Sequence, residues 1–421
     1  MRTIVFAILP GASHVEASMT LATTLKRRGH RIVYVGALDD ADRVTSRGFE
    51  FETVYADVFP PGSTAADGGG FLRLFASGGE VLRNLLRRPD LDAVLSRLRP
   101  AIVVADSVMP FVALSAIRLG LRAVILYTIL PSDGFDPKVP PLMSVTRPGP
   151  GVVTRARVVA EWLAVLARHE IDPLVRTYRR EMKRMIREAG LPPSALLRTE
   201  FGPSVDLPDL VLACEQFDLP RGIRKPARHY VGPCVDLARP GAGFPWESLR
   251  GEGPVVYASL GTQLSHKLFF EHVLAAARLR PNWRVIMSVG NRLSRADFRD
   301  VPRHVVIASR VPQIDVLSRA RVMITHGGIN SVKECIAFGV PMVVFPGFGE
   351  QSGNAARVEF HGLGIRGDRD LAERPERYAA AIERVLEEPS FANAARRMRD
   401  FSTVAEPGAR GADVIESMMG K

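Results

Sequence analysis

Short apolar runs alternate along the chain with longer segments in which apolar residues recur at helical spacing. The runs are rich in β-branched residues and are apolar at nearly every position. This pattern is typical of strands that are buried on both faces of a parallel sheet. Between them lie helical patterns, for example at Glu16–Arg28 and Asn330–Phe338. We expect strands at Thr3–Leu9, Arg31–Gly36, Ala101–Ala105, Ala123–Tyr127, Leu210–Ala213, Pro254–Ser259, Arg284–Val289, His304–Ala308, Arg321–Thr325 and Pro341–Phe345.

The strand–helix alternation occurs twice, which predicts an α/β protein with two doubly wound domains. The stretch Val235–Phe244 is rich in Gly and Pro and separates the two sets of strands. We therefore expect one domain at residues 1–235 and a second at residues 236–421. Pro60–Gly70 is expected to be a loop, and Arg155–Ala189 to form long basic helices with apolar residues along them.

The composition narrows the class of protein. Of 421 residues, 46% are hydrophobic and 24% are charged, which excludes a disordered or fibrous chain. The formal net charge of +11 suggests an anionic partner without naming its class. The three cysteines include no CxxC pair, which fits a reducing cytosol and excludes a disulfide framework. We expect a cytoplasmic protein without a transmembrane helix, because no stretch of 18 apolar residues is free of charge.

The sharpest candidate site is the sequence THGGINS at Thr325–Ser331. A strand, a glycine turn and a helix follow one another here, and the N–H groups of such a helix N-terminus favour an anion such as a diphosphate. His326, Asn330 and Ser331 add side-chain donors. Two other interpretations stay open at this point. Ser331 and Glu334 fit a capping box, and His326 fits a structural histidine.

A second candidate follows the strand that ends near Phe345. A glycine-rich loop presents Glu350 and Gln351 before another helix. At the carboxyl end of a parallel strand, a carboxylate beside an amide suits recognition of sugar hydroxyls. The alternative is that Glu350 is only an acidic residue in a first helical turn.

A third candidate lies in the first half of the chain. His14 follows the first strand at a strand-to-helix turn, and Asp106 ends the strand that begins at Ala101. A carboxylate at that place can orient a histidine and stabilise its protonated form, as in other sets of base and orienting acid. Taken from the pattern alone, Asp106 also fits a helix cap.

The segment from Val311 to Gly364 resembles the nucleotide-sugar signature of family 1 glycosyltransferases with the GT-B fold. The resemblance rests on the pattern PQ…THGGxNSxxE…GVPMVxxP…(D/E)Q…NA, and a weaker resemblance covers most of the chain. It implies two Rossmann-like domains that face each other across a cleft. The N-terminal domain would bind the acceptor and the C-terminal domain the nucleotide sugar. Whether the last helix packs back on the N-terminal domain is left open.

The resemblance also implies roles for single residues. His14 would be the general base, with Asp106 as its partner. Arg310 stands where many members carry an aromatic residue that stacks on uracil. A guanidinium can also stack on a base, so the donor is left open between UDP- and dTDP-linked sugars. The remaining residues are expected around the nucleotide sugar: Ser259 and Thr262 in a loop over the phosphates, Val311 and Gln313 beside the nucleoside, His326, Gly328, Asn330 and Ser331 at the diphosphate, Glu334 at the ribose, and Glu350 and Gln351 at the sugar.

The expected reaction is inverting transfer of a hexose to a hydroxyl of a lipophilic natural product similar to a polyketide or macrolide. Phe71, Leu72, Leu74 and Phe75 offer an apolar wall for such an acceptor, and so do Phe135, Trp162, Leu163 and Leu166. We expect no metal and no cofactor besides the sugar donor.

Alternatives remain. The basic, amphipathic Arg155–Ala189 segment would suit a transferase that acts on a membrane lipid or carotenoid at the membrane surface. A protein that binds a nucleotide without catalysis is a second alternative. No motif supports a nucleic-acid partner. Two short motifs are expected to be coincidental: Gly362–Gly367 matches GxGxxG but follows a helix, and Asp40-Ala41-Asp42 matches DxD but is expected to be a solvated loop.

Overall fold

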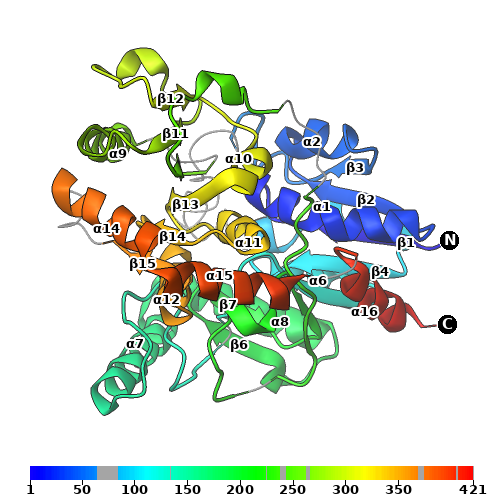
Figure 1. Ribbon diagram of the computed structural model, residues 1–421. Coiled ribbons are helices and arrows are strands. Elements are labelled where there is room, and N and C mark those ends of the chain that lie inside the picture. Colours follow the sequence, from blue (N-terminus) through cyan, green and yellow to red (C-terminus); the bar gives the residue numbers. More distant parts are fainter. Residues whose placement is uncertain are drawn as a thin grey trace.

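The fold consists of two parallel sheets with helices on their faces (Figure 1). The computed structural model describes residues 1–63, 84–132, 134–223, 225–237, 243–261, 266–367, 374–403 and 406–420. The first sheet has the order β3-β2-β1-β4-β5-β8-β9 and the second β12-β11-β10-β13-β14-β15. The strands are β1 (Thr3–Ala7), β2 (Arg31–Gly36), β3 (Glu50–Thr53), β4 (Ile102–Asp106), β5 (Ala123–Tyr127), β8 (Asp209–Val211), β9 (Arg228–Tyr230), β10 (Val255–Ser259), β11 (Arg284–Ser288), β12 (Val305–Ala308), β13 (Ala320–Thr325), β14 (Met342–Val344) and β15 (Gly364–Arg366), with an antiparallel pair β6 (Leu196–Thr199) and β7 (Gly202–Val205) outside the two sheets.

Helices connect the strands and cover the sheets. The long basic segment forms two helices, as expected, and the second buries one apolar face against the first sheet's core. The described helices are α1 (Ala12–Arg27), α2 (Ala41–Thr45), α5 (Pro89–Leu98), α6 (Pro110–Arg118), α7 (Val152–Ile171), α8 (Pro173–Glu188), α9 (Lys267–Leu279), α10 (Gln313–Arg319), α11 (Ile329–Phe338), α12 (Gln351–Phe360), α14 (Pro375–Glu387), α15 (Pro389–Ser402) and α16 (Ala409–Met419), with short 3-10 turns at η1 (Leu38–Asp40) and η3 (Glu215–Phe217).

The α/β class and the doubly wound arrangement are confirmed. All ten expected strands are present, and their pairing within each sheet is parallel. In both sheets the central strands are buried along their whole length, as their continuous apolar sequences require. The carboxyl ends of such strands are where open α/β sheets bind their ligands. The candidate residues of both halves lie at these ends.

A buried ion pair joins the two halves near α12. The guanidinium of Arg357 donates through Nε and Nη2 to Oδ1 of Asp218, at 2.9 and 2.6 Å. Arg357 is 1% exposed and Asp218 is 5% exposed. Arg221 and Tyr230 donate to the other carboxylate oxygen. Since isolated charges are costly to bury, this network fixes the orientation of α12 against the first half.

The last helix lies against the first sheet. In Figure 1, α16 runs beside α1 and β4, and both termini lie on the same side of the molecule. Arg28 of α1 forms ion pairs with Asp413 and Glu416 of α16. The backbone carbonyl of Met419 accepts a hydrogen bond from Arg2.

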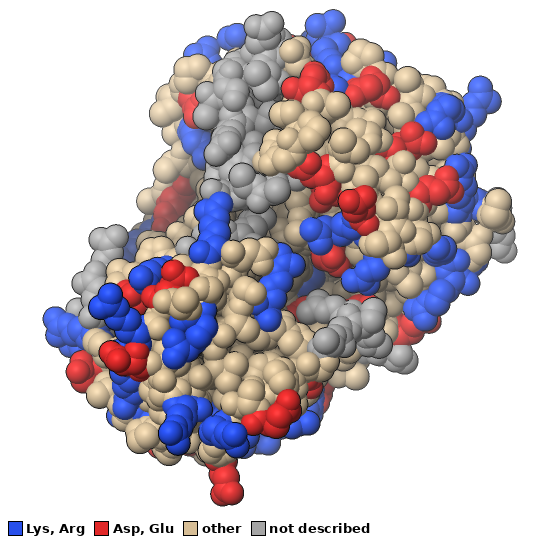
Figure 2. Space-filling view, turned by 90° about the horizontal axis from the view of Figure 1, so that it is seen from above, with Lys and Arg blue, Asp and Glu red and all other residues tan. Residues whose placement is uncertain are grey.

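On the face seen from above, the described charged side chains do not separate into large fields of one sign. Figure 2 shows Lys and Arg side chains interspersed with Asp and Glu over the face seen from above. The net charge therefore marks no single patch on this face. Among the described helices, none is long and apolar enough to cross a membrane.

Candidate active site

His14 and Asp106 meet at the carboxyl edge of the first sheet. His14 lies in the first turn of α1, and Asp106 is the last residue of β4. Their Nδ1 and Oδ2 atoms are 2.8 Å apart, and the Asp106 side chain is fully buried while that of His14 is 16% exposed. Asp106 also accepts from the backbone N–H groups of Leu9 and Val108. Asp106 thus binds His14 and the backbone of the turns at Leu9 and Val108, and its side chain does not cap the helix α6.

Thr128 completes this cluster. Its Oγ1 lies 2.7 Å from His14 Nδ1 and 3.4 Å from Asp106 Oδ2, directly after β5. The side chain is 2% exposed. Thr128 was not predicted from the sequence. The available signal was its position, one residue beyond the strand that neighbours β4.

The charge of His14 is controlled by carboxylates from several elements. Burial alone would lower its pKa, but Asp106, with smaller contributions from Glu350 and Asp40, raises the pKa above 6.5. Glu350 belongs to the second half of the chain. Its charge contributes to the raised pKa of His14, in keeping with the hydrogen bond by which Asn330 of the second half contacts Ser13 of the first.

Asp40 is not solvated, and that expectation was wrong. The residue is 4% exposed, and its carboxylate accepts a hydrogen bond from the backbone N–H of Gly11 at 3.0 Å. The error arose because the partner lies 29 residues earlier in the chain, where a local pattern gives no sign of it. The other short motif is explained by secondary structure, since Gly362 ends α12 and Gly364 begins β15.

The THGGINS segment forms the expected strand, glycine turn and helix. β13 ends at Thr325, and α11 begins at Ile329 with Gly328 as its N-cap. Ser331 is therefore inside the helix, which excludes the capping box. The backbone N–H groups of the first turn have no acceptor within an α-helix and point toward the edge where strand ends gather. Gly327 has φ of 84°, and a Cβ there would meet Val344 at 2.6 Å, so the turn requires glycine.

His326 lies between two glycines. A Cβ on Gly261 or Gly328 would meet its ring at 2.8 or 2.5 Å. Burial lowers the pKa of His326 to about 4, so the ring is neutral at neutral pH. It can therefore offer one N–H donor to an anion but no positive charge.

Asn330 reaches across to the first half of the chain. Its Nδ2 donates to the backbone carbonyl of Ser13 at 2.8 Å, next to His14. Ser331 is 7% exposed in the same helical turn. The diphosphate candidates and the His14 turn therefore lie at one place.

The residues expected around the nucleoside form a hydrogen-bonded chain. Tyr257 donates its hydroxyl to Oε1 of Gln313 at 2.9 Å, and Nε2 of Gln313 donates to Glu334 at 2.5 Å. Tyr257 was missed because a tyrosine within an apolar strand reads as core. Ser259 at the end of β10 accepts from the N–H of Gly261.

Two further residues expected beside the nucleoside, Arg310 and Val311, lie just before Gln313 in the chain. Arg310 is exposed and donates to Asn291, and Val311 is partly buried before α10. Thr262 lies outside the described residues.

Glu350 and Gln351 begin α12. Glu350 is its N-cap residue, and burial raises the pKa of its carboxyl. Gln351 accepts at Oε1 from the backbone N–H groups of Gly347 and Phe348, so this oxygen is used in holding its own loop. Asn354, one helical turn on, donates to the carbonyl of Gly327 and braces the glycine turn.

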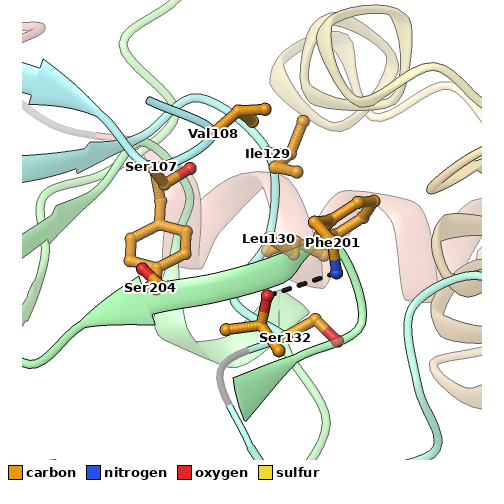
Figure 3. Close-up of a pocket in the computed structure, with 9 residues that line it drawn as sticks. Ser107, Val108, Ile129, Leu130, Ser132, Phe201 and Ser204 are labelled. Carbon is orange, nitrogen blue, oxygen red and sulfur yellow. Dashed lines mark hydrogen bonds between the residues drawn. The ribbon is translucent and has the colours of Figure 1, made fainter. Parts of the chain in front are cut away.

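A small hollow adjoins the His14 cluster (Figure 3). Its volume is about 20 Å³, which is room for about one water molecule and far below the roughly 300–1,000 Å³ of small-molecule sites. Ser107 and Val108 line it from the loop after β4, Ile129 and Leu130 from the loop after β5, and Phe201 from the turn between β6 and β7. Two of its lining residues, Ser107 and Ile129, directly follow Asp106 and Thr128 in the chain.

The expected apolar acceptor wall is only partly described. Phe71, Leu72, Leu74 and Phe75 lie outside the described residues. Trp162 is 2% exposed and donates its indole N–H to Val139, so it is part of the core. Phe135 and Leu163 are exposed, and Leu166 is half-buried. The described members therefore do not form one continuous wall.

The described residues contain no cluster of three or more His, Cys, Asp or Glu side chains suited to a metal ion.

Comparison with known proteins points to one class of enzyme. The model of the C-terminal domain of proteins like erythromycin biosynthesis protein CIII matches residues 277–418. The zeaxanthin glucosyltransferase of Pantoea ananas is 26% identical over 97% of this chain and 94% of its own. The demethyllactenocin mycarosyltransferase of Streptomyces fradiae is 26% identical over 100% of this chain and 87% of its own.

Solved structures agree along the whole chain. The calicheamicin glycosyltransferase CalG4 superposes with a TM-score of 0.73 at 27% identity and covers 100% of this chain and 98% of its own. The glycosyltransferase of kitacinnamycin, at 23% identity, has the same fold with a TM-score of 0.76 over 99% of both chains. The chain therefore has the GT-B fold of glycosyltransferases, and the match of its C-terminal part together with these relatives supports a family 1 glycosyltransferase.

Proposed function

We propose that the protein transfers a hexose from a UDP- or dTDP-linked sugar to a hydroxyl of a lipophilic natural product, with inversion and with His14 as the base. The observation that carries this proposal is the 2.8 Å contact between His14 and buried Asp106, beside the N-terminus of α11. A base and an anion-binding helix end thus lie at one place. Inverting transfer needs both, because the acceptor hydroxyl must lose a proton while the diphosphate leaves.

His14 is suited to proton removal. When Nδ1–H donates to Asp106, the neutral ring keeps its lone pair on Nε2. That nitrogen takes the proton of the acceptor hydroxyl as its oxygen attacks the anomeric carbon. Asp106 then stabilises the imidazolium, as the buried acid does in other base–acid pairs.

The departing nucleoside diphosphate would be stabilised by neutral donors. The free N–H groups at the start of α11 and the helix dipole favour the charge that develops on the leaving group. Ser331 and the N–H of neutral His326 add donors. In this scheme no metal is needed, so we expect transfer to persist in a chelator.

The two halves would divide the substrates. We propose that residues 1–235 bind the acceptor and that residues 236–421 bind the nucleotide sugar through Gln313, Glu334, Glu350 and Gln351. The acceptors that the names of the similar proteins give, demethyllactenocin and zeaxanthin, support a natural-product acceptor.

A membrane lipid or carotenoid is the second candidate acceptor. It is favoured by the start of α7, where Val152 and Val153 are 82% and 70% exposed beside Arg155 and Arg157. Apolar side chains next to arginines suit an anionic lipid surface.

The proposal can be tested without knowing the acceptor. A thermal-shift screen of UDP- and dTDP-sugars identifies the donor, because a ligand that binds only the folded state raises the midpoint. Release of nucleoside diphosphate is then measured with a macrolide aglycone, a polyketide phenol and zeaxanthin in vesicles. Transfer to the soluble aglycones supports the first candidate acceptor, and transfer only to zeaxanthin supports the second. A stabilising donor with no release above hydrolysis for any acceptor would contradict the proposal.

A further inference from the structure

We propose that Asp40 is a positioning residue for His14. Its carboxylate would fix the turn from which α1 starts, and so the place of the histidine at the edge of the sheet. The inference rests on the proposed function only in taking His14 as the base. The placement of His14 can be measured without any substrate.

The turn between β1 and α1 is held by two carboxylates from other elements. At its second residue, the N–H of Leu9 donates to Asp106 at 3.3 Å. At its last residue, the N–H of Gly11 donates to Asp40 at 3.0 Å. His14 follows three residues later and bonds to Asp106 itself. The turn and the histidine are thus tied to β4 on one side and to η1 on the other.

Gly11 makes this support necessary. Its φ of 133° is open to glycine alone, and it caps α1 without a side-chain hydrogen bond. Glycine loses more conformational entropy on folding than any other residue. The hydrogen bond from Asp40 opposes that freedom at the residue that sets the direction of α1.

The burial of Asp40 is not explained by an ion pair. The Asp40 side chain is 5% exposed, while Arg43, the basic residue closest in sequence, is 37% exposed with its Nε 3.9 Å away. That distance is too long for a hydrogen bond. Arg43 instead donates to Glu16 at 3.1 Å. Burying a carboxylate costs free energy unless it is hydrogen-bonded. Among the described residues, the N–H of Gly11 is the group that donates a hydrogen bond to the Asp40 carboxylate.

The charge of Asp40 acts on His14 together with three other groups. Asp106 faces the ring from β4, Thr128 from the end of β5, and Glu350 from the start of α12. Removing the charge of Asp40 while keeping its oxygen should therefore lower the pKa of His14 without moving it. Removing the carboxylate oxygen that accepts from Gly11 should make the turn between β1 and α1 less ordered.

Three variants separate these effects. Asp40→Asn keeps an acceptor for Gly11 and loses the charge. Asp40→Ala loses both. Asp42→Ala removes an exposed carboxylate two residues on and is the matched control. Nitrogen NMR of the imidazoles, assigned with His14→Gln, reports the tautomer and titration of His14 in the free protein.

We expect His14 to keep its Nδ1–H tautomer in wild type, Asp42→Ala and Asp40→Asn, with a lower titration midpoint in Asp40→Asn. In Asp40→Ala the two tautomers should mix. With the donor and acceptor found by the screen, kcat should fall by about 10- to 100-fold in Asp40→Ala, because small misplacements of a reacting group are costly. Nucleotide affinity should not change, and Asp40→Asn should restore most of kcat.

The proposal is overturned if Asp40→Ala keeps the wild-type tautomer, or if Asp40→Asn mixes tautomers as Asp40→Ala does. If Asp40→Ala does not fold, mixed tautomers in Asp40→Asn alone would overturn the proposal. If the tautomer changes as expected but no donor or acceptor is ever used, the positioning role stands and the proposed function fails.

Discussion

The side-chain amide of Asn330 donates a hydrogen bond to the backbone carbonyl of Ser13 at 2.8 Å. This bond joins the two halves of the chain at the point where the candidate diphosphate site and the candidate base meet. Asn330 stands one residue inside α11, and Ser13 directly precedes His14. A residue expected to bind the donor therefore also contacts the turn that carries the base.

Replacing Asn330 by Ala should affect both sides of the site. We expect weaker binding of UDP or dTDP, because a donor near the phosphates is lost, and a lower kcat, because the Ser13 carbonyl loses its partner. Each loss should be about five- to tenfold, the effect of one net hydrogen bond of about 1 kcal/mol. Calorimetric titration and initial rates measure the two. Ser331→Ala is the comparison, since it removes a donor at the phosphates but keeps the bond from Asn330 to Ser13, so its kcat should fall less than that of Asn330→Ala. Unchanged values of both quantities in Asn330→Ala would contradict this account.

Thr128→Val should slow transfer while leaving the donor's affinity intact. Valine has nearly the same shape but no hydroxyl within reach of His14 and Asp106. We expect kcat to fall by about fivefold, which corresponds to roughly 1 kcal/mol. Thr128→Ser, which keeps the hydroxyl, should recover the loss. Equal kcat values for the valine variant and wild type would show that the hydroxyl does not support the base.

The rate of transfer should rise with pH through the pKa of His14. Burial opposes the charged ring, but Asp106 and, to a lesser extent, Glu350 and Asp40 raise this pKa above 6.5. A base must be neutral to accept a proton, so kcat/KM should be low below that pKa and level above it. Asp106→Asn removes the main stabilising charge and should move the rise to lower pH. A rise that stays at the same pH in this variant would exclude His14 as the titrating base.

Arg357→Ala should destabilise the protein strongly. The substitution leaves Asp218 buried without its main partner, and breaking a buried ion pair costs about 3–5 kcal/mol. The loss should appear as a lower urea midpoint. Lys267→Ala breaks an exposed pair with Glu271 and should change stability by less than about 0.5 kcal/mol. Similar midpoints for both variants would show that the pair does not hold the two halves together.

The centre of the fold was predictable from the sequence, whereas three of the four edge strands were not. Strands such as β4 and β10 are buried on both faces, so their sequences are apolar throughout. The edge strands β3, β9 and β15, with the sequences EFET, RHY and GIR, are short and partly polar. Their pairing depends on a neighbouring strand that is already in place, and no local pattern records it.

The candidate site divides in the same way. His14 and Asp106 stand at the ends of predicted strands, so the rule that ligands bind at such ends pointed to them. Thr128 and Asp40 were not identified, because what distinguishes them is a contact with a distant segment: Thr128 with His14, and Asp40 with Gly11. A buried carboxylate cannot be told from a solvated one until its partner is known.

The measurement that tests the central claim most directly is kcat for His14→Ala, with nucleotide affinity measured on the same preparation. If His14 removes the acceptor proton, kcat should fall by roughly 10²- to 10⁴-fold, the usual contribution of a general base. The affinity for UDP or dTDP should stay at the wild-type value, because the diphosphate is held by α11. A variant that binds nucleotide normally and keeps a kcat within about threefold of wild type would contradict the account.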